Sequence, residues 1–302
     1  MKLKNQIPLF LKGMAMGAAD VVPGVSGGTI AFITGIYRTL IDSIKSINHH
    51  ALKILFQKGI KAFWKSINGN FLLVLFSGIA TSVLLLVRAI HYLLDNFPVL
   101  LWAFFFGLIV ASAFVVGANV KKWKVSTVLV LISGFAIAYY INISTPAETP
   151  ESSWFIFLSG MIAISAMILP GVSGSFILLL LKKYEFITGA LKDFDIKIII
   201  IFASGCVVGL ISFANVLSWM FKKYYNATIA MLTGFMVGSL NVVWPWKNVI
   251  ETRINSKGTE VPFLYESVLP ANFEGENQMV LAIIVMVVGF SVIFLLEKLS
   301  KQ

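Results

Sequence analysis

The stretch best suited to chemistry occurs twice in the chain. The run from Pro23 to Gly28 (Pro-Gly-Val-Ser-Gly-Gly) returns 147 positions later, from Pro170 to Ser175 (Pro-Gly-Val-Ser-Gly-Ser). Serine hydroxyls and glycine N–H groups are donors suited to binding an anion. Proline followed by glycine also interrupts a helix, because proline lacks an N–H donor and glycine permits a positive φ. Each copy therefore predicts a helix, a polar break and a new helix.

The first turn after each break is the candidate anion site. A helix N-terminus presents unpaired N–H groups and a partial positive charge, and nearby hydroxyls add further donors. The candidate substrate-binding residues of the two copies are Ser26, Gly27, Gly28, Thr29, Ser173, Gly174 and Ser175, and the breaks themselves are Pro23, Gly24, Pro170 and Gly171. The alternative is that these small residues only permit close packing of helices, as they do in membrane proteins.

Three ionisable residues lie near the two motifs in mostly apolar sequence. Such residues are functional candidates within a membrane. Asp20 precedes the first break and is a candidate for gating or proton coupling, whereas Met167 stands at the aligned position. Arg38 is a candidate charge partner for the anion, and Glu185, which aligns with it, is assigned to gating or proton coupling. Alternatively, Arg38 and Glu185 reach the lipid headgroups from the membrane surface.

The composition places these motifs in a polytopic membrane protein. The chain has 302 residues, of which 58% are hydrophobic and 13% are charged, and its mean hydropathy is +0.88. The net charge of +10 is assigned to loops that face anionic membrane lipids, and no nucleic-acid partner is expected. Cys206 is the single cysteine, and no metal-ligand cluster or nucleotide-binding motif is present. We therefore expect no enzyme activity, no metal and no cofactor.

The elements that position the motifs are predicted from apolar runs. Two re-entrant hairpins, at 5–45 and 153–192, contain the breaks, although a single kinked span is the alternative for the first. Broken backbone persists inside a bilayer only where protein or a wet cavity surrounds it. The six predicted spans are 66–87, 96–120, 125–147, 198–221, 224–246 and 277–296. An amphipathic helix at 50–65 is predicted to lie on the membrane surface, and a loop at 247–276 separates the last two spans.

These elements divide the chain into two repeats, residues 1–147 and 148–302. Each repeat holds one hairpin and three spans, so the second repeat is predicted to be inverted relative to the first. Two inverted repeats with broken helices are the architecture of many secondary transporters. Most of the 24 Lys and Arg residues fall on one side if both termini are cytoplasmic, which predicts that orientation. The predicted fold is thus an all-α polytopic membrane protein with inverted-topology repeats.

The run from Lys12 to Thr29, together with the second motif at 170–175, closely resembles a bacterial membrane family. That family was once catalogued as a domain of unknown function and is now understood as undecaprenyl-phosphate translocases. The resemblance covers nearly the whole chain and implies return of the lipid-carrier phosphate from the outer to the inner leaflet of the cytoplasmic membrane, for reuse in cell-envelope synthesis. The chain departs from the expected pattern at Arg38, where we would expect an acidic residue such as Glu185.

Residue types and spacing alone lead only to a transporter of an anionic substrate. The resemblance implies a lipid flippase whose prenyl tail stays in the bilayer. One rival is a channel or carrier for a small soluble anion, and the other is a membrane scaffold that transports nothing. A lateral gap beside the hairpins would favour the lipid, a closed aqueous pore the small anion, and a dry packed interface the scaffold.

Overall fold

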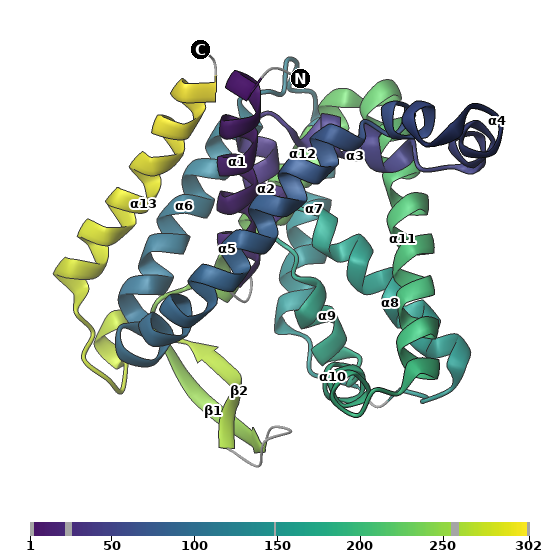
Figure 1. The fold of residues 1–302 in the computed structure, drawn as a ribbon. Coiled ribbons are helices and arrows are strands. Elements are labelled where there is room, and N and C mark those ends of the chain that lie inside the picture. The colour runs from purple at the N-terminus through teal and green to yellow at the C-terminus, as the bar shows by residue number, and fades with distance from the viewer. Residues whose placement is uncertain (1–2, 22–25, 148, 255–259, 301–302) are drawn as a thin grey trace.

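A computed structural model describes residues 3–21, 26–147, 149–254 and 260–300. Helices dominate it (Figure 1), which is the arrangement that pairs backbone groups within each apolar segment. The helices are α1 Leu3–Val21, α2 Gly27–Ile33, α3 Tyr37–Lys45, α4 His49–Ser66, α5 Gly69–Asn96, α6 Pro98–Gly117, α7 Val125–Ile143, α8 Ser153–Ile168, α9 Gly174–Leu180, α10 Tyr184–Lys192, α11 Ile196–Lys223, α12 Tyr225–Gly238 and α13 Met279–Ser300, with the short 3-10 helices η1 Leu240–Val243 and η2 Pro270–Asn272. The chain is thus mostly helical, as expected.

Five segments of the described chain are long and apolar enough to cross a membrane. They are Gly69–Leu86, Pro98–Gly117, Val125–Ile143, Ile196–Lys223 and Tyr225–Val243. Each corresponds to one of the six predicted spans. The remaining predicted span falls on α13, which has an apolar stretch at Met279–Leu295. Length and composition therefore support a polytopic membrane protein.

The return arm of each predicted hairpin is divided into two short helices. In the first, α2 ends at Ile33 and α3 begins at Tyr37, with Gly35 at a φ of +73° between them. In the second, Lys182 has a φ of 49° between α9 and α10. Left-handed residues of this kind turn the chain sharply at a helix end. The arms are therefore bent, which the apolar pattern did not reveal.

The predicted loop at 247–276 contains two strands, which is a correction to the all-α prediction. Strands β1 (Lys247–Ile254) and β2 (Glu260–Ser267) form an antiparallel pair in which Lys247 faces Ser267. Figure 1 shows this pair on the side of the molecule opposite both termini. We call these two sides the hairpin side and the terminus side.

The two halves of the chain use equivalent helix packing. Helix α1 packs on α5 as α8 packs on α11, and α6 packs on α13 as α12 packs on α7. A Cβ atom on Gly78 would overlap the carbonyl oxygen of Phe10, and one on Gly205 would overlap that of Phe157. Glycines therefore allow close helix contact at positions related by the offsets of the repeat.

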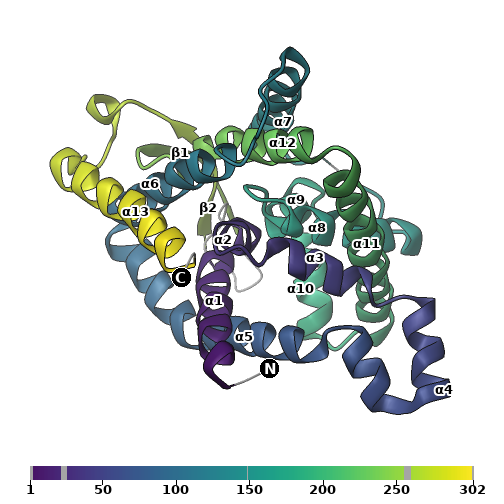
Figure 2. The same ribbon diagram turned by 90° about the horizontal axis from the view of Figure 1, so that it is seen from above.

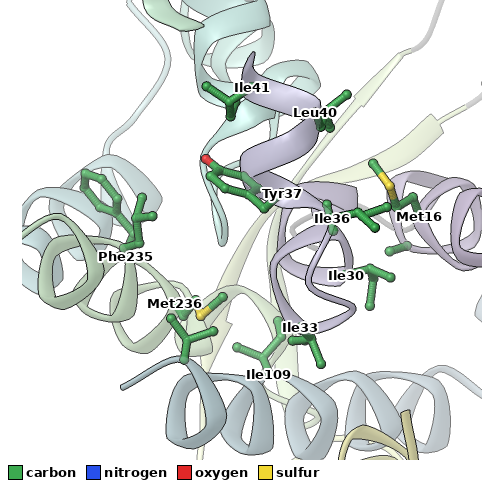
Figure 3. Packing of buried hydrophobic residues seen from close by; sticks show 14 of the residues in the cluster. Met16, Ile30, Ile33, Ile36, Tyr37, Leu40, Ile41, Ile109, Phe235 and Met236 are labelled. Atoms are coloured by element: carbon green, nitrogen blue, oxygen red, sulfur yellow. The ribbon is translucent and has the colours of Figure 1, made fainter. Parts of the chain in front are cut away.

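The broken segments lie in opposite parts of the molecule and meet near its middle. Figure 1 shows α1 and α2 in the part nearer the termini, and α8 and α9 in the part nearer the β hairpin. Seen from above, α2 lies near the centre (Figure 2). The buried cluster around α2 and α3 includes Tyr37, Ile109 and Met236, and therefore joins elements of both halves (Figure 3).

Helix α4, which includes the predicted amphipathic helix at 50–65, extends away from the rest of the protein (Figures 1 and 2). Its backbone is non-helical at Gly59, so it consists of two short helices at an angle. Phe56 and Ile60 are 85% and 71% exposed. Large exposed apolar side chains on a basic helix are typical of membrane-surface binding, and that role stays a prediction.

Candidate substrate-binding site

The first break is closed by groups of the protein itself. Pro23 and Gly24 lie outside the described residues. On the far side of the break, the Gly27 N–H donates a hydrogen bond to Asp20 Oδ1 at 2.7 Å, and the Gly28 N–H donates to Ser26 Oγ at 3.1 Å. Ser26 is thereby the N-cap of α2. Two N–H groups predicted to bind the anion are therefore already occupied, one of them by a carboxylate.

The first break contacts the second half of the chain. Ser26 Oγ donates to the Met167 carbonyl at 3.2 Å, and the Tyr37 hydroxyl donates to the Ile168 carbonyl at 3.1 Å. Both acceptors lie at the end of α8, just before the second break. The structure thus brings the start of α2 and the end of α8 together. Sequence reasoning missed Tyr37, whose alignment with Tyr184 was the available signal.

The second break has the same motif in a different environment. Gly171 has a φ of +83°, and a Cβ atom there would lie 2.8 Å from the Phe235 carbonyl oxygen, so the turn requires glycine. Pro170 is buried beside it. Ser173 is the N-cap of α9 but makes no side-chain capping bond. Its hydroxyl instead pairs with that of Ser175 at 2.9 Å, and Ser175 is exposed.

Thr29 contributes a buried hydroxyl to the first turn of α2. Its side chain is 1% exposed, and its Oγ1 has no hydrogen-bond partner within the described part of the chain. Buried polar groups are nearly always paired, so an orphaned hydroxyl calls for an explanation.

Arg38 and Glu185 lie away from both breaks. Arg38 is exposed in α3 and lines a cavity of about 280 Å3 on the terminus side, together with Asn119, Tyr225 and Glu297. Glu185 is exposed in the first turn of α10, which Figure 1 shows in the part nearer the β hairpin. The structure therefore brings these aligned residues neither to one another nor to the breaks.

A second polar cavity lies on the hairpin side. Its volume is about 120 Å3, and it is lined by polar residues and by one face of α9: Asn142, Ser144, Asn241, Lys247, Tyr265, Ser267, Phe176, Leu179 and Leu180, with Pro146 and Val242. Sequence reasoning missed Lys247, because a lysine at the edge of a long loop looks like an ordinary surface residue.

Two largely apolar grooves border the breaks at equivalent positions. The first groove has a volume of about 500 Å3 and the second about 320 Å3. The matched lining residues are Ala15, Ala18, Ala19, Ile30 and Leu108 in the first groove, and Ile162, Ser165, Ala166, Ile177 and Phe235 in the second. Ala19 and Ile30 flank the first break as Ala166 and Ile177 flank the second. Each break therefore has an apolar space beside it.

Comparison with known proteins identifies the family of this chain. A family model described as undecaprenyl phosphate translocase-like matches residues 16–261. The chain belongs to this family. A relative from Vibrio cholerae, named polyprenyl-phosphate transporter, is 45% identical over 305 aligned residues, covering 100% of this chain and 99% of the relative. A Staphylococcus aureus protein of the same name is 32% identical, covering 78% of this chain and 85% of its own length. No solved structure matches the chain.

The region matched by the undecaprenyl phosphate translocase-like family contains most of the candidate site. Both breaks, both grooves' matched residues, and the cavities around Arg38 and Lys247 fall mainly within residues 16–261. Helix α13 lies beyond the matched region. The alignment with the Vibrio cholerae relative, in contrast, covers the whole chain and therefore includes α13.

Proposed function

We propose that this chain transports undecaprenyl phosphate across the bacterial cytoplasmic membrane, from the outer to the inner leaflet. The observation that supports this substrate best is the pair of apolar grooves beside the two breaks. A soluble anion needs no apolar space along its path, whereas a polyprenyl chain does. The names of the two relatives, each a polyprenyl-phosphate transporter, point to the same class of lipid. The lipid leaves unchanged, so no chemical step is involved.

The phosphate crosses where the breaks meet, because a charged group cannot pass through hydrocarbon alone. Ser173, Gly174 and Ser175 meet it at the second break, and Ser26, Gly27, Gly28 and Thr29 meet it at the first. The Asp20 carboxylate holds the Gly27 N–H, a donor that would otherwise be open to an anion. The phosphate therefore displaces Asp20, and protonation of Asp20 makes this exchange easier. That displacement gives Asp20 its gating role.

The two halves serve opposite leaflets as inverted repeats. The re-entrant helical hairpin that contains α1 and α2 enters from the terminus side. The re-entrant helical hairpin that contains α8 and α9 enters from the opposite side, where the β hairpin lies. Arg38 receives the phosphate in the cavity on the terminus side. With both termini cytoplasmic, the lipid moves from the hairpin side to the terminus side. The prenyl tail stays in the grooves and in the surrounding lipid throughout.

The orientation is tested by labelling single cysteines in a Cys206→Ser background. Thr145 is exposed just after α7 and Ser126 is exposed near its start. In intact cells, a cysteine at position 145 should react with an impermeant thiol reagent, whereas one at position 126 should react only after the membrane is opened. Labelling of both positions from outside would contradict the proposed topology.

Transport is tested with the purified full-length protein in proteoliposomes. Undecaprenyl phosphate should change leaflets much faster than in protein-free liposomes, as followed by its accessibility to an added phosphatase. Inorganic phosphate should not accumulate inside. Phosphate uptake without lipid movement would favour a small-anion carrier, and the absence of both would favour a scaffold.

Substitutions that fill the grooves test whether the prenyl tail uses them, independently of the residues that bind the headgroup. Ala18→Phe and Ser165→Phe place a bulky ring at aligned positions of the first and second groove. Each should slow transport of undecaprenyl phosphate at least about tenfold. Leu84→Phe is the matched control, because Leu84 is 76% exposed and lines neither groove. Equal transport by all three variants would remove the grooves from the mechanism.

A further inference from the structure

Lys247 is a half-buried cation outside the two breaks. Its Nζ donates a hydrogen bond to the Val242 carbonyl at 2.7 Å, and lies 4.1 Å from the centre of the Trp102 ring and 5.3 Å from that of Tyr265. Burial lowers the pKa of Lys247 from 10.5 to about 7. Val242 and Tyr265 also line the cavity on the hairpin side, so the ammonium group lies at the cavity wall.

Among the described residues, a carbonyl acceptor and two aromatic rings surround the Lys247 ammonium group. Within the described residues, no carboxylate is hydrogen-bonded to its Nζ. Lys247 pairs with Ser267 across the β hairpin, and the neighbouring Glu266 points to the opposite face of the sheet. Burying a cation without an anion is costly. A bound anion would offset that cost. If Lys247 had only a structural role, the cost would remain.

The cavity is placed on the route to the second break. Phe176, Leu179 and Leu180 of α9 form one wall of it, and Phe176 follows Ser175 directly. About 10–15 Å3 of such space holds one water molecule, so a cavity of about 120 Å3 has room for a phosphate group. Ser144, Asn241 and Ser267 add hydroxyl and amide groups to its lining.

We propose that Lys247 binds the phosphate monoester headgroup of the lipid in this cavity, before the headgroup reaches Ser173 and Ser175. The proposal rests on the proposed function and extends it with a docking site on the hairpin side. Arg38 then has a counterpart on the opposite side of the molecule, and each cavity offers one cationic side chain. Lys247 acts by charge and hydrogen bonding alone, with no covalent step.

The test is headgroup binding to the full-length protein in nanodiscs. The variants are Lys247→Met, which keeps the length of the side chain, and Lys247→Arg, which keeps its charge. Lys192→Met is the matched control, since Lys192 is exposed on α10 in the same part of the molecule. The ligands are undecaprenyl phosphate, uncharged undecaprenol and inorganic phosphate.

Lys247→Met should weaken binding of undecaprenyl phosphate at least about tenfold, the usual effect of losing a hydrogen bond to a charged group. It should leave undecaprenol binding unchanged, and Lys247→Arg and Lys192→Met should bind the phosphate almost as the parent protein does. Equal affinity of Lys247→Met and the parent protein would overturn the proposal. So would inorganic phosphate binding at Lys247 as tightly as the lipid, because the site would then serve a free anion.

A measurement on the unmodified protein guards against misfolding of Lys247→Met. A polyprenyl phosphate with a photoreactive group in its first isoprene unit should crosslink to Phe176, Tyr265 or their neighbours. Crosslinks confined to other regions would overturn the docking site. If the parent protein binds the lipid at Lys247 but moves none in proteoliposomes, the docking site stands and the proposed transport function fails.

Discussion

The first and second breaks carry nearly the same residues but differ in how their polar groups are used. At the first break, Asp20 and Ser26 accept the N–H groups of Gly27 and Gly28. At the second, the Ser173 hydroxyl caps nothing and pairs with exposed Ser175. One member of the pair is closed by the protein's own anion and the other is open. Two copies of one motif can therefore differ in whether their N–H groups are already bound by the protein.

The difference accompanies two substitutions between the copies: Met167 stands in place of Asp20, and Ser175 in place of Gly28. Asp20 in the first copy aligns with Met167 in the second, so only the first break has a carboxylate within reach of its glycine. A negative charge near a helix start is stabilising. The second break lacks that internal anion, and for this reason we propose that it accepts the incoming phosphate more readily. The predictions below test this contrast, from the largest expected effect to the smallest.

Adding a methyl group to the matched glycines should have the largest effect. A Cβ on Gly27 would lie 2.5 Å from Asp20 Oδ2, and one on Gly174 would lie 2.5 Å from the Ala163 carbonyl oxygen. Gly27→Ala should abolish transport, because its Cβ would occupy the space in which the phosphate must approach the Gly27 N–H. Gly174→Ala should also destabilise the fold by about 1–3 kcal/mol, because the backbone of α8 cannot move aside. Transport assays and thermal unfolding in detergent measure the two effects.

Gly189→Ala is the control for both variants. Gly189 lies within α10, and a Cβ there would meet nothing within 4 Å. This variant should transport and unfold like the parent protein. Wild-type transport by Gly27→Ala would show that the closed state of the first break has no part in the mechanism.

Removing the Asp20 carboxylate at the first break should have the second-largest effect. Asp20→Ala leaves the Gly27 N–H without its acceptor, and should lower transport about tenfold, because a hydrogen bond to a charged group contributes about 1.5–3 kcal/mol. Met167→Ala, at the aligned position, should have little effect, since Met167 is 42% exposed. Asp20→Asn keeps an acceptor for Gly27 but cannot be protonated, so it should remove the pH dependence of transport. An unchanged pH profile would exclude proton coupling through Asp20.

Substitutions of the two aligned serines should have different effects, one on protein stability and the other on lipid binding. Ser26→Ala removes a helix cap and should lower the free energy of unfolding by about 1 kcal/mol. Ser173→Ala removes no cap, so its stability should stay the same while headgroup affinity falls by about 1 kcal/mol, or roughly fivefold. Thermal unfolding and lipid binding distinguish the two. If Ser173→Ala lost stability and kept its affinity, the second break would be a packing element.

A separate prediction concerns pH and the cavity beside the second break. Because burial lowers the pKa of Lys247 to about 7, the unfolded chain binds more protons at this residue between pH 7 and about 10.5. Stability should therefore rise with pH in that window. This increase in stability should be missing in Lys247→Met. The difference in unfolding temperature between the parent protein and Lys247→Met should therefore change from pH 7 to pH 10. A constant difference would show that Lys247 stays charged in the folded protein.

Local sequence determined the class of protein and the position of the breaks. Apolar runs predicted five segments that the structure also shows as long enough to span a membrane, because span length depends on composition alone. Proline and glycine marked the helix ends near Ile168 and Gly174, because these residues act on their own backbone. Asp20 was identified as a candidate because a charge in apolar sequence needs a reason.

Only the tertiary structure decided what surrounds each break. The bond from Tyr37 to Ile168 joins residues that are 131 positions apart, and the cavity around Lys247 gathers side chains from α7, α9, η1 and both strands. The grooves likewise form between helices that are distant in the chain. Such contacts depend on how helices pack against one another, which the residue pattern of a single segment does not contain. Two copies of one motif therefore reached different environments.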